Sequence, residues 1–521
     1  MKKFISASLT GLLILAFGAI VYAQDAPKLG GTFPGLELRA SGWIDAQTLF
    51  FKNVTGGNPG SGIYNVWGLG SSFTGGVPSG DLNRKLSYWE SRMRLKFDWV
   101  YGKATSGTVQ FEADAQPWGG TPGGNAGQIS ERNTYGYVSA DRAALEIKHV
   151  YFDFATPYFG IPVPMNFRVG LQPLAIRPPL LLTTDAMGIV GTFKVDPVTI
   201  IPIYSKYLEG ANRTADDVDL YGIHVNAAIG KLTVGGYGLY YNMNAYPFLV
   251  SQAISTVSGL SRNAVGTQTA DFWWLGVYAD GRVGPVNINF DFIYDGGKVK
   301  SKQTFDASDV KYRGWATRAA IDFPLEQFNF GIIGAYGSGA DTEKTSSSGL
   351  AGSLTSSGQQ SHKVGSFVVP PATEAAAAFG ESIVLFSTWI NRGDSGIGNS
   401  LNYNQVSKGG LGGLWYAKVY GSFKATPWYK ITLSGLYIGD TTKNGNTFGN
   451  AQDAAGNLRN DKRIGWEADL VQEIEIYKNL KFAIGAGYLW SGKAMDLWNG
   501  VDANFSPANP WQITSNMTYF F

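Results

Sequence analysis

Residues 89–99 of the chain read WESRMRLKFDW, and this stretch decides the fold class. Its large apolar residues share one parity and its charged residues share the other: Trp89, Met93, Leu95, Phe97 and Trp99 alternate with Glu90, Arg92, Arg94, Lys96 and Asp98. Only an extended strand places two such sets on opposite faces. The charged face needs water or partners, and the apolar face needs an apolar environment. A strand between lipid and a wet lumen satisfies both faces.

The length of this stretch agrees with a membrane crossing. Trp89 and Trp99 are ten steps apart, which is about 33 Å at roughly 3.3 Å per residue. Tilted by about 40°, the strand spans a height near ~25 Å, the thickness of the lipid-facing band of a membrane barrel. Aromatic girdles mark the two edges of that band. We therefore predict that five aromatic residues lie at the membrane interfaces: Trp89, Trp99, Trp490, Trp511 and Phe521.

The same alternation recurs along the chain and predicts a closed antiparallel transmembrane β-barrel of the all-β class. The count is about 18 strands, or 16 if the weak pair around Asp196-Pro197 is set aside. The expected strands lie near 36–50, 88–100, 106–116, 144–155, 165–175, 187–195, 198–207, 217–229, 231–242, 271–281, 285–295, 311–323, 327–338, 411–424, 428–439, 462–474, 479–490 and 510–521.

The connections between these strands alternate in length. Every second one is short, as at 196–197 and 230–231, which is typical of periplasmic turns. The others are long and rich in Gly, Ser, Asn and Pro, which is typical of extracellular loops, and an even strand count places both termini in the periplasm. The longest is 339–410, whose apolar part Ala375–Phe386 could form a short helix. A surface loop, a lid and an inward-folded plug all fit this segment.

Composition supports the barrel and excludes several other classes. Gly numbers 68 and aromatic residues make up 14% of the 521 residues, while only 16% are charged, against roughly a quarter in soluble domains. A mean hydropathy of −0.07 is too polar for a helical membrane protein. With no Cys and 3 His, we expect no disulfide, no metal site and no cofactor.

The first residues have the pattern of a secretory signal. Lys2 and Lys3 precede an apolar run from Leu9 to Val21, and Ala23 completes a small-residue cleavage site. We predict a signal peptide at 1–23, a periplasmic lead at 24–35 and the barrel at 36–521. Removing two lysines leaves 40 basic residues (42 − 2) against 40 acidic ones. This neutral balance does not favour nucleic acid as a partner.

The charged residues on the inward parity of the first five strands are the candidate pore-lining residues. Opposing charges in a narrow channel create a transverse field that orders water and sorts solutes. The alternative is that these charges only keep the wall wet or pair with one another. The candidates are Arg39, Asp45, Glu90, Arg92, Arg94, Lys96, Asp98, Glu112, Asp114 and Arg168.

The leading functional hypothesis is passive diffusion of small hydrophilic solutes and ions through a water-filled lumen in the outer membrane. Outer-membrane lipid and lipopolysaccharide would then be its surroundings. A scaffold or sheath for a partner protein, or an adhesin that displays the long loops, is the alternative. An enzyme ranks third, because an inward His224 has no visible serine partner and the sequence contains no convincing catalytic set.

Five sequence segments resemble the homotrimeric outer-membrane porins of sulfate-reducing and related bacteria. They are Arg92–Asp98 (RMRLKFD), Ser106–Glu112 (SGTVQFE) followed by Trp118-Gly119, Lys148–Asp153 (KHVYFD), Arg168–Leu174 (RVGLQPL) and the later Asp219–Ile223 (DLYGI). The resemblance implies a homotrimer whose segment after the fifth strand narrows the pore. Here that segment is Ala175–Ala186, and its only charges are Arg177 and Asp185.

Overall fold

The fold is described here from a computed structural model. It describes residues 35–53, 85–114, 145–156, 163–178, 180–208, 215, 217–244, 268–301, 310–343, 363–371, 381–386, 409–498 and 504–521. The predicted signal peptide and all of the predicted periplasmic lead except Gly35 lie outside these ranges. Among the described residues, no helix has the length and hydropathy needed to cross a membrane.

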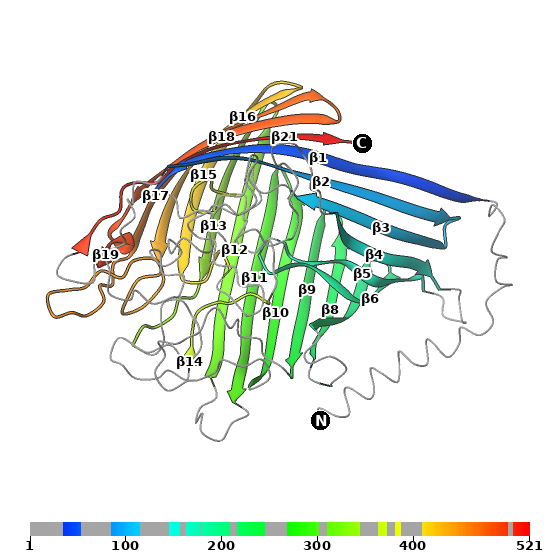
Figure 1. The fold of residues 1–521 in the computed structure, drawn as a ribbon, viewed down its shortest axis with the longest axis horizontal. Helices are drawn as coiled ribbons and strands as arrows, with labels where there is room; N and C mark the ends of the chain where they lie inside the picture. Colours follow the sequence, from blue (N-terminus) through cyan, green and yellow to red (C-terminus); the bar gives the residue numbers. More distant parts are fainter. Residues whose placement is uncertain are drawn as a thin grey trace.

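The described residues form one large sheet of 19 strands (Figure 1). One of these, β14 (Lys363–Val364), is a two-residue strand parallel to β12, so 18 strands (19 − 1) form the wall. Each predicted strand overlaps one of them, which confirms the count of 18. The wall strands are β1 (Leu36–Lys52), β2 (Lys85–Tyr101), β3 (Thr105–Asp114), β4 (Glu146–Ala155), β5 (Met165–Ile176), β6 (Leu182–Val195), β7 (Val198–Leu208), β8 (Val218–Ile229), β9 (Leu232–Met243), β10 (Gln268–Val283), β11 (Val286–Ser301), β12 (Val310–Leu325), β13 (Phe328–Gly337), β15 (Leu414–Thr426), β16 (Tyr429–Asp440), β17 (Arg463–Tyr477), β18 (Leu480–Ser491) and β21 (Trp511–Phe520).

The sheet closes on itself. The first strand, β1, pairs antiparallel with β2 along one edge and with β21 along the other, so that Ile44 lies opposite both Met93 and Tyr519. Figure 1 shows the red β21 beside the blue β1. A closed sheet leaves no row of unpaired backbone N–H and C=O groups, which is the condition for placing strands in lipid. The prediction of a closed antiparallel transmembrane β-barrel is confirmed.

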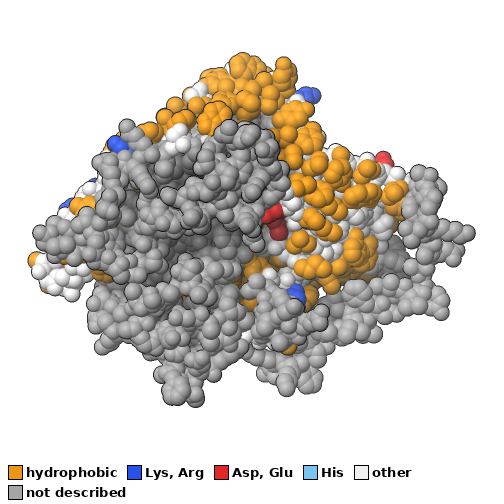
Figure 2. Space-filling view, in the orientation of Figure 1, with side chains coloured by type: hydrophobic (Ala, Val, Ile, Leu, Met, Phe, Trp, Pro, Cys, Tyr) orange, Lys and Arg blue, Asp and Glu red, His pale blue; other side chains and the backbone are white. Residues whose placement is uncertain are grey.

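The two faces of the wall meet different environments. Along β13, Phe328, Phe330 and Ile332 are exposed, while the alternating Ile333 and Ala335 are buried. Figure 2 shows hydrophobic side chains gathered over the described wall at the right and along the top of the view. An exposed apolar surface of this extent requires lipid rather than water.

The two ends of the barrel differ in their connections. Very short turns join β6 to β7, β8 to β9, β10 to β11 and β12 to β13, and all of them lie at one end. We call this the short-turn end, and the opposite end the long-connection end. Two further short strands, β19 (Leu497–Trp498) and β20 (Asn504–Phe505), together with the 3₁₀ turn η4 (Lys493–Met495), lie in the connection between β18 and β21.

Candidate functional site

A covered apolar cluster lies on the inward faces of β8–β12, beside polar residues such as Asp291 and Arg318. Leu220, Leu239, Tyr241, Phe272, Trp274, Ile293 and Tyr312 are each at most 2% exposed. Their rings interlock: Phe272 and Tyr312 lie edge to face at 5.0 Å, and Tyr241 and Trp274 do so at 5.5 Å. We call this part of the lumen the dry half. Close-packed rings exclude water from the interior of this cluster.

One filler of the dry half is a hairpin that leaves the wall. From Gln172 to Ala186 the ends of β5 and β6 pair with each other but have no partner on β4 or β7. Ile176, Leu181 and Leu182, all at most 1% exposed, pack into the apolar cluster. We call residues 172–186 the inward hairpin. It contains the segment Ala175–Ala186, although most of the described residues of that segment belong to β5 and β6.

Two glycines stand where the hairpin departs from the wall. Gly170 and Gly188 are cross-strand partners on β5 and β6. A Cβ on Gly170, whose φ is +132°, would lie 2.3 Å from the carbonyl oxygen of Val150, and one on Gly188 would lie 2.3 Å from that of Tyr204. Only glycine permits so close an approach of neighbouring backbones. The pair therefore allows the bend that turns the hairpin into the lumen.

Arg177, at the hairpin tip, bridges to the opposite wall. Its guanidinium donates to Asp291 on β11 at 2.7 Å and to Asp280 on β10 at 3.1 Å, and it lies 4.1 Å over the ring of Tyr278. Burial opposes the charge, but the hydrogen bonds to Asp291 and Asp280 outweigh it and raise the pKa of Arg177. The bridge therefore stays charged and fixes the tip in place.

The second filler is the connection between β13 and β15, which was predicted as the longest extracellular loop. Two of its described stretches, 363–371 and 381–386, fold into the barrel. In the first stretch, the backbone carbonyl of Val368 accepts a 2.7 Å hydrogen bond from the buried Trp274 indole, and that of Pro371 accepts one of 2.6 Å from Tyr207. Of the three alternatives for 339–410, these stretches favour the inward-folded plug. We call them together the plug.

The second stretch of the plug is anchored on a buried carboxylate of β17. Glu467 accepts hydrogen bonds from Ser382 Oγ at 2.8 Å and from the amides of Ile383, Val384 and Leu385 at 3.0, 2.7 and 3.1 Å. Residues 381–386 form a bent backbone around this carboxylate, so no helix covers the described end of Ala375–Phe386. Consecutive amides that converge on one anion hold it in place of water.

Glu381 ties the same stretch to two other strands. Its carboxylate accepts from Arg318 Nε on β12 at 2.7 Å and from the hydroxyl of Tyr416 on β15. Lys418 Nζ donates to the Glu381 backbone carbonyl at 2.7 Å. Burial raises the pKa of the Glu381 carboxyl, and the nearby Arg318 opposes this shift. The plug is thus held by charged hydrogen bonds, each stronger than a neutral one.

The inward faces of β1–β4 form a different surface, which we call the charged wall. Glu112 is at its centre: it pairs with Arg94, lies 3.8 Å from Arg92 and lies 3.5 Å from Lys148. Lys148 Nζ in turn lies 2.8 Å from Asp185 of the inward hairpin. A chain of ion pairs therefore runs across three wall strands to the hairpin.

His149 adds a second link between the charged wall and the hairpin. Its Nε2 lies 2.7 Å from Asp185 Oδ1, and its Nδ1 lies 2.6 Å from Gln110 Oε1. Asp185 is therefore held by two neighbouring side chains of β4. Both charges predicted for the constriction, Arg177 and Asp185, make ion pairs with the wall.

The other candidate pore-lining residues also have partners. Asp45 accepts from the Arg92 amide at 3.0 Å, Gln47 donates to Glu90, and Lys96 lies 2.9 Å from Asp98. Arg168 donates to Asp153 at 2.8 Å and lies over the Tyr151 ring. These contacts agree with the alternative that the charges pair with one another, while most of these side chains remain partly exposed.

Two candidates stand apart from this set. Arg39 pairs with Glu37 near the short-turn end, and both side chains are more than 60% exposed, so this pair lies at the barrel rim. Asp114 ends β3 opposite Arg92, and its side chain lies outside the described part of the structure.

The candidate interface aromatics lie on the outside of the wall. Trp89, Trp99, Trp490 and Phe521 are exposed by 57%, 40%, 50% and 47%, whereas Trp511 is only partly exposed. Sequence reasoning missed Trp428, Trp466 and Tyr477, which are equally exposed. For Trp466 the available signal was its outward parity on β17; Trp428 and Tyr477 lie at the short turns beside β16 and β17.

Sequence reasoning also missed the polar residues that hold the plug. Glu467 and Asp469 fall on the inward parity of β17 and could have been noticed from that alternation. Arg318, Lys418 and Glu381 become significant only through contacts between distant segments. Among the described residues, no group of His, Asp or Glu could hold a metal ion.

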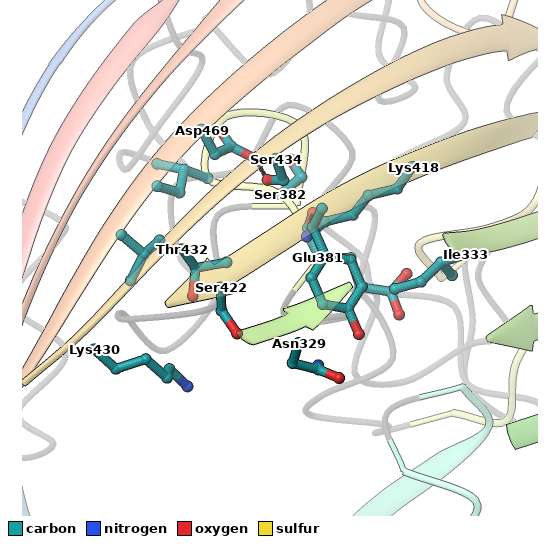
Figure 3. A pocket seen from close by; sticks show the side chains of 13 residues that line it. Asn329, Ile333, Glu381, Ser382, Lys418, Ser422, Lys430, Thr432, Ser434 and Asp469 are labelled. Atoms are coloured by element: carbon teal, nitrogen blue, oxygen red, sulfur yellow. Dashed lines mark hydrogen bonds between the residues drawn. The ribbon is translucent and has the colours of Figure 1, made fainter. Parts of the chain in front are cut away.

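Two cavities lie toward the short-turn end. One, of about 350 Å³, lies between the plug and β13, β15, β16 and β17 (Figure 3). The other, of about 550 Å³, lies beside Lys424, Glu473 and Lys481. Lys430 lines both.

Comparison with known proteins gives similarity at the level of solved structures alone. No protein-family model matches the chain, and no curated protein matches it. Similar structures include OpdK of Pseudomonas aeruginosa with vanillate (7% identity, TM-score 0.47, 92% of this chain and 98% of that one) and OccK8 (OprE) of the same organism (10%, 0.45, 92% and 98%). A BenF-like porin from Pseudomonas fluorescens Pf-5 is similar as well (9%, 0.44, 93% and 98%). At these values the fold assignment rests on the strand pairing described above.

Proposed function

We propose that the protein is an outer-membrane porin through which small hydrophilic solutes and ions diffuse passively. The observation that carries this proposal is the closed barrel whose outside is apolar and whose charged wall stays partly exposed inside. The dry half and the plug occupy the lumen beside β8–β12. The path for solutes therefore follows the charged wall and reaches the two cavities near the short-turn end.

Planar-bilayer recording tests the proposal. Purified protein added to a lipid bilayer in potassium chloride is expected to produce discrete upward steps of conductance, because each inserted barrel opens one water-filled path. Heat-unfolded protein is the control and should give no steps. Barrels that insert, as shown by protease protection, but remain electrically silent would contradict an open path.

The orientation and assembly are part of the same proposal. We place the short-turn end and both chain termini in the periplasm and the long connections outside the cell, surrounded by lipid and lipopolysaccharide. The homotrimer rests on the sequence resemblance. Mass measurement of the detergent-extracted complex checks it: three chains are expected, and a single chain would contradict the trimer.

The sheath alternative is disfavoured by the contents of the lumen. A threaded partner would have to displace the plug and the inward hairpin, whose apolar residues are almost completely buried. For the enzyme alternative, His224 Nε2 lies 2.7 Å from the hydroxyl of Tyr278, and no serine of the described residues bonds to it. The partner of this histidine is thus a phenol and not the serine of a Ser-His-Asp site.

A further inference from the structure

We propose that the 350 Å³ cavity beneath the plug is a binding site for a neutral polyhydroxylated solute such as a monosaccharide or a sugar alcohol. This inference rests on the proposed porin function and names the class of solute that pauses on the path. The cavity is capped by Glu381, Ser382 and Ile383 of the plug, and wall strands form its sides.

The wall of the cavity is built from two rows of cross-strand partners (Figure 3). The lower row joins Asn329 of β13 to Ser422 of β15 and Thr432 of β16. The next row joins Tyr420, Ser434 and Asp469 across β15, β16 and β17. Because paired strands hold such neighbours about 5 Å apart, the polar groups form a fixed array rather than a flexible cluster.

Two acceptors in this array lack hydrogen bonds. Asp469 is 3% exposed, and its Oδ1 has no hydrogen-bond partner among the described residues. Asn329 Oδ1 has no partner within the described part of the chain either. Neither oxygen is open to the cavity, so a solute meets the other atoms of Asp469 and Asn329, which line its wall.

The array also offers donors. Lys418 and Lys430 contribute ammonium groups, and the hydroxyls of Ser422 and Thr432 make no hydrogen bond to another described residue. The ring of Tyr420 lies against Gly331, where a Cβ would come within 2.3 Å of it. Lys418 Nζ lies over this ring, 5.5 Å from its centre, so the ring and the ammonium group border the same part of the cavity.

This mixture favours a neutral polyol over an ion. A carboxylate ligand brings only acceptors and would face the Asp469 oxygen, whereas an ammonium ligand brings only donors and would face Lys418. A hydroxyl both donates and accepts, so adjacent hydroxyls of one molecule can bond to Ser422, Thr432 and the neighbouring charged groups at once. The space, several times the roughly 30 Å³ that one water occupies, admits such a molecule.

Current interruption by sugars tests the site. Single channels in potassium chloride are titrated with D-glucose and mannitol, and with guanidinium and acetate as charged probes. The double variant Ser422→Ala/Thr432→Val removes two hydroxyls with little change of shape. Thr518→Val is the matched control, because Thr518 lines the neighbouring cavity and its hydroxyl bonds to Asn516.

We expect glucose or mannitol to interrupt the current of the unmodified channel. The double variant should raise the half-saturating concentration about tenfold, since two hydrogen bonds are lost, and Thr518→Val should leave it unchanged. Interruptions by guanidinium or acetate alone, or equal sensitivity in both variants, would overturn the site. Steps of conductance without any sugar effect would reject the sugar site but not the porin function. A barrel that conducts no current would reject the sugar site and the porin function together.

Discussion

The charged wall and the dry half are both built from strands with alternating inward and outward residues. Their inward residues nevertheless have opposite character. On β2 the inward parity holds Glu90, Arg92, Arg94, Lys96 and Asp98; on β10 it holds Ala270, Phe272, Trp274, Gly276 and Tyr278. Placing a closed barrel in lipid requires paired strands and an apolar outside, but it does not determine the residues inside. What stands inside depends on whether the inward face meets water or another segment of the chain. The plug and the inward hairpin, and not the barrel alone, therefore define the path.

The largest effect is expected from Trp274→Ala in the dry half. The change removes ring contacts to Tyr241 and Phe272 and leaves the Val368 carbonyl without its donor. We expect a loss of about 3–5 kcal/mol of stability, seen as a lower unfolding temperature of the barrel in detergent. Trp466→Ala, on the lipid-facing side, is the control and should lower the unfolding temperature far less. Equal effects would mean that the dry half is not a packed core.

A smaller effect is expected from Glu467→Gln, which weakens the anchor of the plug. The amide keeps one acceptor but places an NH₂ group against the donors of residues 382–385. If the closed position of the plug is destabilised by about 2 kcal/mol, its equilibrium shifts toward the open position roughly thirtyfold. Single-channel records should then show brief excursions to higher conductance.

Glu473→Gln is the matched control for the anchor. Glu473 also faces inward on β17, but it pairs with Lys430 and contacts no described plug residue. Its records should show no excursions to higher conductance of the kind expected from Glu467→Gln. Quiet records from Glu467→Gln as well would show that the plug does not limit the current.

The smallest of these effects is expected from Arg94→Glu in the charged wall. The substitution reverses one charge beside Glu112. It should lower the permeation barrier of cations relative to anions by about 1 kcal/mol, which is roughly fivefold in permeability ratio. Reversal potentials across a salt gradient measure this. Arg39→Glu, at the exposed rim, should shift the ratio much less because water screens it. Identical ratios for both variants would place the solute path away from the charged wall.

Much of the barrel could be predicted from the sequence, because each strand carries its own period-two signal. Even β1, with Asp45 inward and Ile44 outward, follows local parity. The dry half had a weaker signal: residues 272–278 read FWWLGVY, apolar on both parities, which is typical of a strand covered on both faces. The plug could not be placed, because Glu467 meets Ser382 across 85 residues and no local pattern encodes that contact.

The most direct measurement exploits the absence of cysteine from the chain. Single cysteines are introduced at Lys96 in the charged wall and at Leu239 in the dry half, and each variant is treated with a charged, membrane-impermeant thiol reagent during bilayer recording. The account predicts that Lys96→Cys reacts and reduces the current while Leu239→Cys stays unreactive. Rapid reaction at Leu239→Cys together with none at Lys96→Cys would contradict the division of the lumen.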